Sequence, residues 1–286
     1  MLAILWALGS AIGYGASDYA AGLATRAASV IRVTILAEAA SVLALLLVAP
    51  WVSTQTPSAA SAAWAAVAGL GGIIGAMTLY LGFRHAAFSV AGPLSAVASA
   101  GFSVLAGLLF GEHPSGLALA GIALALPAIV AVSASRGGEP EGGDPGSRAA
   151  GTAYGLVAGV CFAVLFIGLN RSGSEHDLWP LVIAQVTGLI AVALIAAVSR
   201  DLKPPPLRAG WLAILAGVTG AAGTACYFVA THESLLAVTA VITSLYPGST
   251  ILLARVLLGE RLTRTRLAGL GLAAASVALI AVGGSG

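Results

Sequence analysis

Apolar residues occur along the chain in runs of about 20 positions, separated by short polar segments. A helix rises 1.5 Å per residue, so about 20 apolar residues cross the roughly 30 Å hydrocarbon core of a bilayer. The runs are rich in Ala and Gly and do not alternate in polarity, which favours helices over barrel strands. The pattern predicts an all-α polytopic membrane protein with ten transmembrane helices. The helices are expected at residues 2–22, 31–51, 61–83, 88–110, 115–135, 151–170, 179–199, 210–230, 235–258 and 265–283.

Composition supports a membrane protein. Hydrophobic residues make up 59% of the chain and charged residues 8%, with a mean hydropathy of +1.00. This leaves too little polar surface to cover a water-soluble globule. The first run starts without a preceding basic segment, so we expect a retained helix rather than a cleaved signal peptide. The net charge of +2 comes from scattered basic residues, so no nucleic-acid partner is expected.

Two stretches repeat each other at a separation of 147 residues. LYLGFRHAA at 79–87 and CYFVATHES at 226–234 both place a histidine five positions after a tyrosine. The same offset matches Glu38 with Gln185, Trp64 with Trp211, Tyr80 with Tyr227 and His85 with His232. We therefore predict two copies of a five-helix unit, with a flexible cytoplasmic linker between them. The expected bounds are 1–135 for the first copy, 136–150 for the linker and 151–286 for the second copy.

An odd number of helices per copy predicts that the second copy is inverted in the membrane relative to the first. If the odd-numbered loops share one face, the other face holds only Arg171. The positive-inside rule then makes the odd-numbered loops cytoplasmic and puts both termini outside a bacterial inner membrane. The basic residues on or near the predicted cytoplasmic face are Arg26, Arg32, Arg84, Arg136, Arg148, Arg200, Lys203, Arg208, Arg255, Arg261, Arg264 and Arg266.

The fourth helix of each predicted copy ends in Gly-Glu, as LLFGE and VLLGE, and LALAGI or TRLAGL follows soon after. Together with the duplicated five-helix units, these motifs resemble the drug/metabolite transporter (DMT) superfamily, specifically EamA-type permeases. The usual proline before the Gly-Glu is supplied by Pro247 in the second copy, while Ser99 stands there in the first. The resemblance implies alternating-access secondary transport of a small metabolite, such as an amino acid, an aromatic compound or a drug-like solute. We expect export without ATP, and the chain has no GxxxxGK[ST] loop for nucleotide phosphates.

Two carboxylates within predicted helices are candidates for proton coupling. Asp18 precedes the end of the first helix by about four residues, and Glu38 lies about two turns into the second. A carboxyl group in a low-dielectric cavity holds a proton more readily than one in water, so either side chain could take up and release protons. The alternative is that both are cytoplasmic-side anchors, either paired with Arg26, Arg32 or Arg84 or held by structural hydrogen bonds.

Aromatic, histidine and amide side chains are candidates for the wall of a solute cavity. Polar groups at membrane depth are uncommon and each needs a physical reason. The alternative for the Tyr and His residues is a place at helix ends or headgroups, since both types are common there. The candidates are Tyr14, Tyr80, His85, Asn170, Gln185, Tyr227, His232 and Tyr246.

Glu112 and Glu260 precede the fifth helix of each predicted copy, where we expect each carboxylate to cap that helix.

Other functions receive less support from the sequence. A sugar-phosphate or nucleotide-sugar exchanger of the same superfamily would need basic residues in its cavity, whereas the single lysine, Lys203, lies in a predicted loop. A non-transporting membrane accessory subunit stays open as an alternative. Neither an HExxH motif nor a serine nucleophile elbow is present, so we expect neither an enzyme nor a metal site or cofactor. The expected partners are a small-molecule solute, lipid and protons, and the expected assembly is a monomer or weak homodimer.

Overall fold

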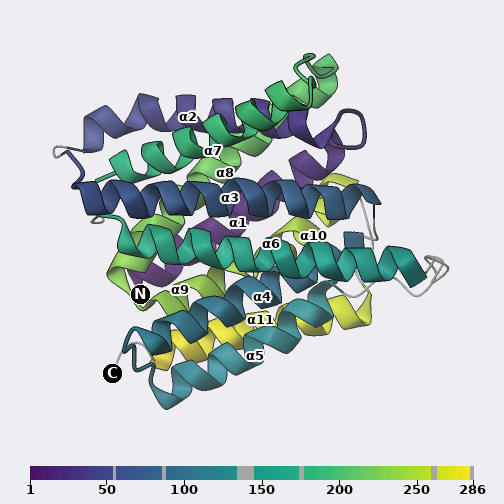
Figure 1. Ribbon diagram of the computed structural model, residues 1–286. Helices are drawn as coiled ribbons and strands as arrows, with labels where there is room; N and C mark the ends of the chain where they lie inside the picture. Colours follow the sequence, from purple (N-terminus) through teal and green to yellow (C-terminus); the bar gives the residue numbers. More distant parts are fainter. Residues whose placement is uncertain (54–55, 86–87, 134–144, 174–176, 259–262, 284–286) are drawn as a thin grey trace.

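The computed structural model describes residues 1–53, 56–85, 88–133, 145–173, 177–258 and 263–283. Within these ranges the chain forms eleven helices and no strand (Figure 1), so the all-helical prediction is confirmed. The helices are α1 (Leu2–Ala24), α2 (Val30–Val52), α3 (Ala59–His85), α4 (Phe88–Leu109), α5 (Gly116–Ser133), α6 (Pro145–Arg171), α7 (Trp179–Val198), α8 (Leu207–Glu233), α9 (Leu236–Thr243), α10 (Tyr246–Leu258) and α11 (Arg264–Gly283).

Long apolar helices make up most of the bundle. Seven of the described helices, α2, α3, α4, α6, α7, α8 and α11, are long and apolar enough to cross a membrane, and α5 holds a shorter apolar stretch, Gly116–Ala131. Large apolar side chains such as Leu47, Leu194 and Val198 lie exposed on the outside, as expected where lipid replaces water. These features describe a multi-pass membrane protein. Crossing by ten helices stays a prediction.

The helix ends gather at two opposite ends of the bundle. In Figure 1 the last residues of α1, α3, α5, α7 and α10 lie at one end, which we call the odd-loop end. The start of α1 and the end of α11 lie at the other, which we call the terminal end. This arrangement places the connections after α1 and α7 on the same side of the molecule.

The ninth predicted helix, 235–258, is divided. The structure has α9 and α10 in its place, separated by Ser244 and Leu245. Proline has no backbone N–H, so Pro247 cannot bond to the carbonyl of Thr243 four residues earlier, which favours a kink or a break at this point. Gly248 instead donates its backbone N–H to the Leu245 carbonyl at 2.8 Å. The structure therefore divides the predicted span 235–258 into two helices close to Pro247.

The two predicted copies pack against each other reciprocally. Helix α1 packs on α8 as α6 packs on α3, and α2 packs on α8 as α7 packs on α3. Glycine permits the closest approaches. A methyl group added at Gly217 would lie 2.1 Å from the carbonyl oxygen of Ala37, and one added at Gly69 would lie 2.1 Å from that of Ala184. No side chain fits at such distances, so these two equivalent glycines allow α2–α8 and α3–α7 backbone contact.

Glu112 caps a different helix from the one that was predicted. Its carboxylate accepts hydrogen bonds from the backbone N–H groups of Leu236 at 2.6 Å and Ala237 at 3.0 Å, at the start of α9 rather than α5. The N-cap residue of α9 is Leu235, whose apolar side chain cannot accept a hydrogen bond. A carboxylate from the other half of the chain therefore satisfies the free N–H groups. Glu260 lies outside the described residues.

Candidate functional site

A cavity lies between the two halves of the chain. Its volume is about 100 Å³, and its walls come from α1, α2 and α3 of the first half and from α6, α7, α8 and the start of α10 of the second. Helical spacing explains why these residues share the cavity. Thr34, Glu38 and Ser41 follow the i, i+4, i+7 pattern that brings side chains to one face of α2. The structure thus assembles one chamber, with polar groups set in a mainly apolar wall, from helices far apart in the sequence.

Asp18 and Glu38 both line this cavity. The Glu38 atom Oε2 is buried and has no hydrogen-bond partner among the described residues. It faces α7, where a methyl group added at Gly188 would lie 3.4 Å away. The ion pair observed among the described residues joins Arg32 to Asp201, so Asp18 and Glu38 do not pair there with an arginine. Arginine pairing, one form of the alternative interpretation, is therefore not seen in the described part of the chain.

Three of the candidate tyrosines also line the cavity. Tyr14 on α1 reaches α8, where its hydroxyl lies 3.0 Å from the Thr224 hydroxyl. The hydroxyl of Tyr246, the first residue of α10, lies 3.1 Å from that of Ser95. Tyr80 on α3 lies within electrostatic range of both Asp18 and Glu38. These side chains surround the carboxylates with aromatic surface.

Gln185 on α7 completes the candidate residues that the structure brings to the cavity. It lies about one turn before Gly188, which faces Glu38. At the repeat offset it is also the counterpart of Glu38. The cavity is therefore asymmetric in charge, with a carboxylate from one half and a neutral amide from the other.

Three other candidates, Asn170, Tyr227 and His232, are not among the residues that line this cavity. Asn170 and Tyr227 link α6 with α8, and His232 bonds within α8. The Asn170 amide donates to the Thr231 hydroxyl at 3.0 Å and to its carbonyl at 3.2 Å. Tyr227 donates to the Phe166 carbonyl at 3.2 Å and stacks on that ring with centroids 4.4 Å apart. The Nδ1 atom of His232 lies 2.8 Å from the Phe228 carbonyl oxygen.

The side chain of His85 lies outside the described residues.

A difference of one residue explains why the repeated tyrosines have different surroundings. Tyr80 and Tyr227 are 147 positions apart, whereas the glycines with equivalent packing, Gly69 and Gly217, are 148 apart. One residue corresponds to a rotation of about 100° around a helix. Tyr80 therefore faces the cavity while Tyr227 faces α6.

Several lining hydroxyls were not among the sequence candidates. Thr34 donates to the Val30 carbonyl at 2.8 Å, Ser41 to the Gly217 carbonyl at 2.8 Å, and Ser17 to the Ala216 carbonyl at 2.9 Å. Their sequence positions could have identified them, because Ser17 adjoins Asp18, and Thr34 and Ser41 lie on the same helix face as Glu38. The last two contacts join α1 and α2 to α8, so these hydroxyls hold the cavity wall together.

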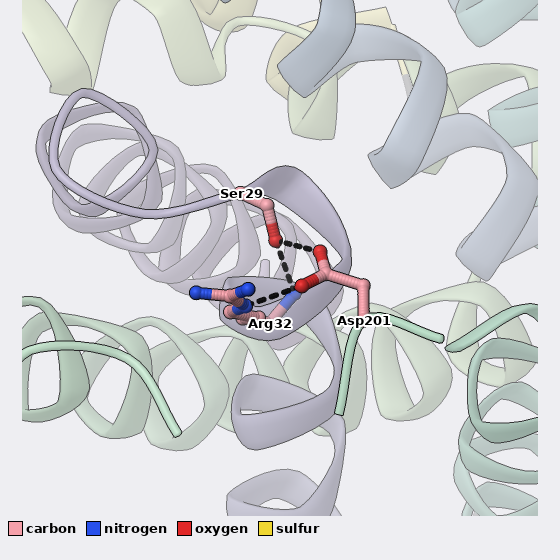
Figure 2. Close-up of polar contacts among 3 residues, drawn as sticks. All are labelled: Ser29, Arg32 and Asp201. Carbon is pink, nitrogen blue, oxygen red and sulfur yellow. Dashed lines mark hydrogen bonds and ion pairs between the residues drawn. The ribbon is translucent and has the colours of Figure 1, made fainter. Parts of the chain in front are cut away.

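A second polar contact between the halves lies at the odd-loop end (Figure 2). The Ser29 hydroxyl and the Arg32 Nε both donate to the carboxylate of Asp201, and the Arg32 backbone N–H donates to the Ser29 hydroxyl oxygen at 3.3 Å. The hydrogen bond from Ser29, together with the Arg32 guanidinium, lowers the pKa of Asp201 below its ordinary value. The start of α2 is thereby tied to the connection between α7 and α8.

The turn that carries Asp201 has an unusual backbone. Arg200 has a φ of 52°, in the left-handed region that favours glycine. The Asp201 N–H donates to the Ala196 carbonyl at 3.0 Å and the Arg200 N–H to the Ala197 carbonyl at 3.2 Å, which closes the end of α7. The helix end therefore fixes the direction in which Asp201 leaves the bundle.

The structure is a bundle of long apolar helices around a cavity that contains two carboxylates. Comparison with known families finds that residues 149–282 match the EamA-like transporter family. Members of this family are transporters rather than enzymes, which implies a small-molecule solute and contact with membrane lipid. A search of curated proteins found no match.

A solved structure has the same fold. Its title reads only "Crystal structure of protein", and it matches with a TM-score of 0.72 at 19% sequence identity, over 97% of this chain and 97% of the other. At this identity the likeness concerns the fold alone. The match extends over the first half as well as the second, although the family match covers the second half.

Proposed function

We propose that the protein is a secondary transporter that carries a small organic metabolite through the cavity between its two halves. The cargo would be an amino acid, an aromatic compound or a drug-like solute. The observation that carries this proposal is the cavity itself, in which Asp18 and Glu38 line the wall and one oxygen of Glu38 is buried without a partner. Unsatisfied buried polar groups are costly, so their retention needs a function.

Alternating access is supported by two contacts between the halves at opposite ends of the bundle. Asp201 bonds to Ser29 and Arg32 at the odd-loop end, and Glu112 bonds to the first turn of α9 at the terminal end. Breaking one contact while the other holds would open the cavity to one side at a time. The reciprocal packing of α1 on α8 and α6 on α3 supports the proposal that the halves are inverted copies.

Proton coupling through Asp18 and Glu38 is part of the proposal. Both side chains line the chamber, and neither is held by an ion pair within the described residues. A carboxyl group in such a place can exchange a proton for cargo during each cycle. In this scheme export runs from a cytoplasmic odd-loop end across a bacterial inner membrane, with the protein as a monomer or weak homodimer.

The exchange of sugar phosphates or nucleotide sugars receives no support from the cavity. Its described walls contain neither lysine nor arginine, which a doubly negative cargo would require.

The test is transport by purified protein in sealed vesicles, across a panel of small metabolites. We expect movement of at least one solute, and we expect Glu38→Gln to reduce its rate at least about tenfold because the carboxylate is lost. Glu233→Gln, which removes an exposed carboxylate at the end of α8, is the matched control and keeps the rate of the unmodified protein. If no solute moves across the panel, the proposal is wrong. A partner that co-purifies at fixed stoichiometry, with no transport, would instead favour an accessory subunit.

A further inference from the structure

We infer that the cavity binds an organic cation, a protonated amine carried on a small aromatic or aliphatic body. This inference rests on the proposed function and names the class of its cargo. Asp18 and Glu38 are the only carboxylates among the residues that line the cavity, and these residues include no lysine, arginine or histidine. Where these carboxyl groups are ionised, a low-dielectric bundle selects against anions and in favour of cations.

Several hydroxyl groups of the cavity wall already donate their hydrogens to other groups. The hydroxyl hydrogens of Ser17, Thr34 and Ser41 are each committed to a backbone carbonyl. Thr224 donates to the Gly220 carbonyl at 2.9 Å, so Tyr14 must act as the donor in its bond to Thr224, and its hydrogen is committed too. The hydroxyl hydrogens of Ser17, Thr34, Ser41 and Tyr14 are therefore not available to the two carboxylates.

Glu38 shows the consequence of these committed hydrogens most directly. Its atom Oε2 is buried without a hydrogen-bond partner in the described structure, although a carboxylate oxygen can accept two hydrogen bonds. An ammonium group has three N–H donors and no acceptor, which is the complement of this site. The amide of Gln185 also lines the cavity and could contact the rest of the cargo.

The aromatic wall suits the same class of ligand. Tyr14, Tyr80, Tyr246, Phe162 and Phe166 line the cavity, and the faces of such rings attract cations as well as apolar groups. Tyr80 is within electrostatic range of both carboxylates. The volume of about 100 Å³ has room for roughly seven to ten atoms the size of a water molecule. A small amine fits this space.

Binding of three probes that share a phenyl ring but differ in charge tests the inference. They are 2-phenylethylammonium, 2-phenylethanol and phenylacetate, titrated into purified protein in detergent at pH 7 with Kd read by calorimetry. We expect the ammonium to bind at least about tenfold more tightly than the alcohol, and phenylacetate to bind most weakly. Equal binding of ammonium and alcohol, or tightest binding of phenylacetate, would overturn the inference.

Variants locate the site. Glu38→Gln and Asp18→Asn are each expected to raise the Kd for 2-phenylethylammonium at least about tenfold and to leave the Kd for 2-phenylethanol unchanged. Glu233→Gln is expected to change neither Kd. Gly188→Ala keeps all charges and adds a methyl 3.4 Å from Glu38 Oε2, an ordinary contact, so it tests the site without the loss of a carboxylate. Gly188→Ala is expected to raise the Kd for 2-phenylethylammonium more than the Kd for 2-phenylethanol. Variants that leave the ammonium Kd unchanged would overturn the assignment.

Transport data separate this inference from the proposed function. Movement of neutral solutes in vesicles, without binding of 2-phenylethylammonium, would overturn the cation inference and leave the transporter proposal intact. Binding of 2-phenylethylammonium that depends on Glu38, without movement of any solute, would support the cation site and contradict the transporter proposal.

Discussion

The carboxylate of Glu112, just after α4, lies against the first turn of α9, where Leu236 donates to it at 2.6 Å. Ala237 donates to its second oxygen at 3.0 Å. The two N–H groups belong to a helix of the other half, so one acidic side chain joins the halves at the terminal end. Asp201 and Arg32 form the corresponding link at the odd-loop end.

Substitution of Glu112 should weaken the terminal-end link. Glu112→Gln keeps the shape but loses the negative charge near the free N–H groups, so we expect the free energy of unfolding to fall by about 1 kcal/mol. Thermal unfolding in detergent measures the change. Glu233→Gln should leave the midpoint unchanged, and an equal shift in both variants would contradict the assigned cap.

The odd-loop contact should depend on pH. The pKa of Asp201 is lowered in the folded protein, so this group stabilises the fold at pH values above its ordinary pKa of about 3.9. The contribution is lost as the pH falls through the lower, folded-state pKa. We expect Asp201→Asn to reduce the thermal midpoint at pH 7, and this difference to shrink as the pH falls below about 3.9. A difference that persists unchanged in acid would contradict the contact.

Arg200 offers a stabilising change beside that contact. Its φ of 52° is unfavourable for a residue with a Cβ, and glycine adopts this conformation freely. Arg200→Gly should raise the free energy of unfolding by about 1 kcal/mol, with thermal unfolding as the measurement. Arg200→Ala is the matched control, because it removes the same side chain but keeps the strain. A gain in stability with alanine equal to that with glycine would show that the backbone is not the cause.

The close contact between α2 and α8 should tolerate no side chain. A methyl group at Gly217 would lie 2.1 Å from the Ala37 carbonyl oxygen, so Gly217→Ala must push the helices apart. We expect a loss of stability of about 1 to 3 kcal/mol, seen as a lower thermal midpoint. Gly101→Ala is the control, because nothing lies within 4 Å of a Cβ at that position. A midpoint for Gly217→Ala as high as that of the control would contradict the packing.

Sequence reasoning predicted the helical class because long apolar runs are a strong signal, and it brought Asp18, Glu38 and Gln185 forward because polar groups are uncommon inside such runs. It could not foresee which face each side chain presents. Tyr80 and Tyr227 look equivalent in the sequence, yet only Tyr80 lines the cavity, because the packing repeat is offset by one residue. Sequence reasoning also could not predict that Glu112 caps α9, because this contact joins residues 124 positions apart.

The central claim is that cargo passes through the cavity beside Glu38. A cysteine at Thr34, in protein whose Cys161 and Cys226 are replaced by alanine, would place a thiol on the cavity wall one turn before Glu38. The measurement is solute movement in vesicles before and after this thiol is modified with a bulky maleimide, with Glu233→Cys as the surface control. Our account predicts that modification stops transport at Thr34→Cys and spares the control. Full modification of Thr34→Cys with transport unchanged would contradict it.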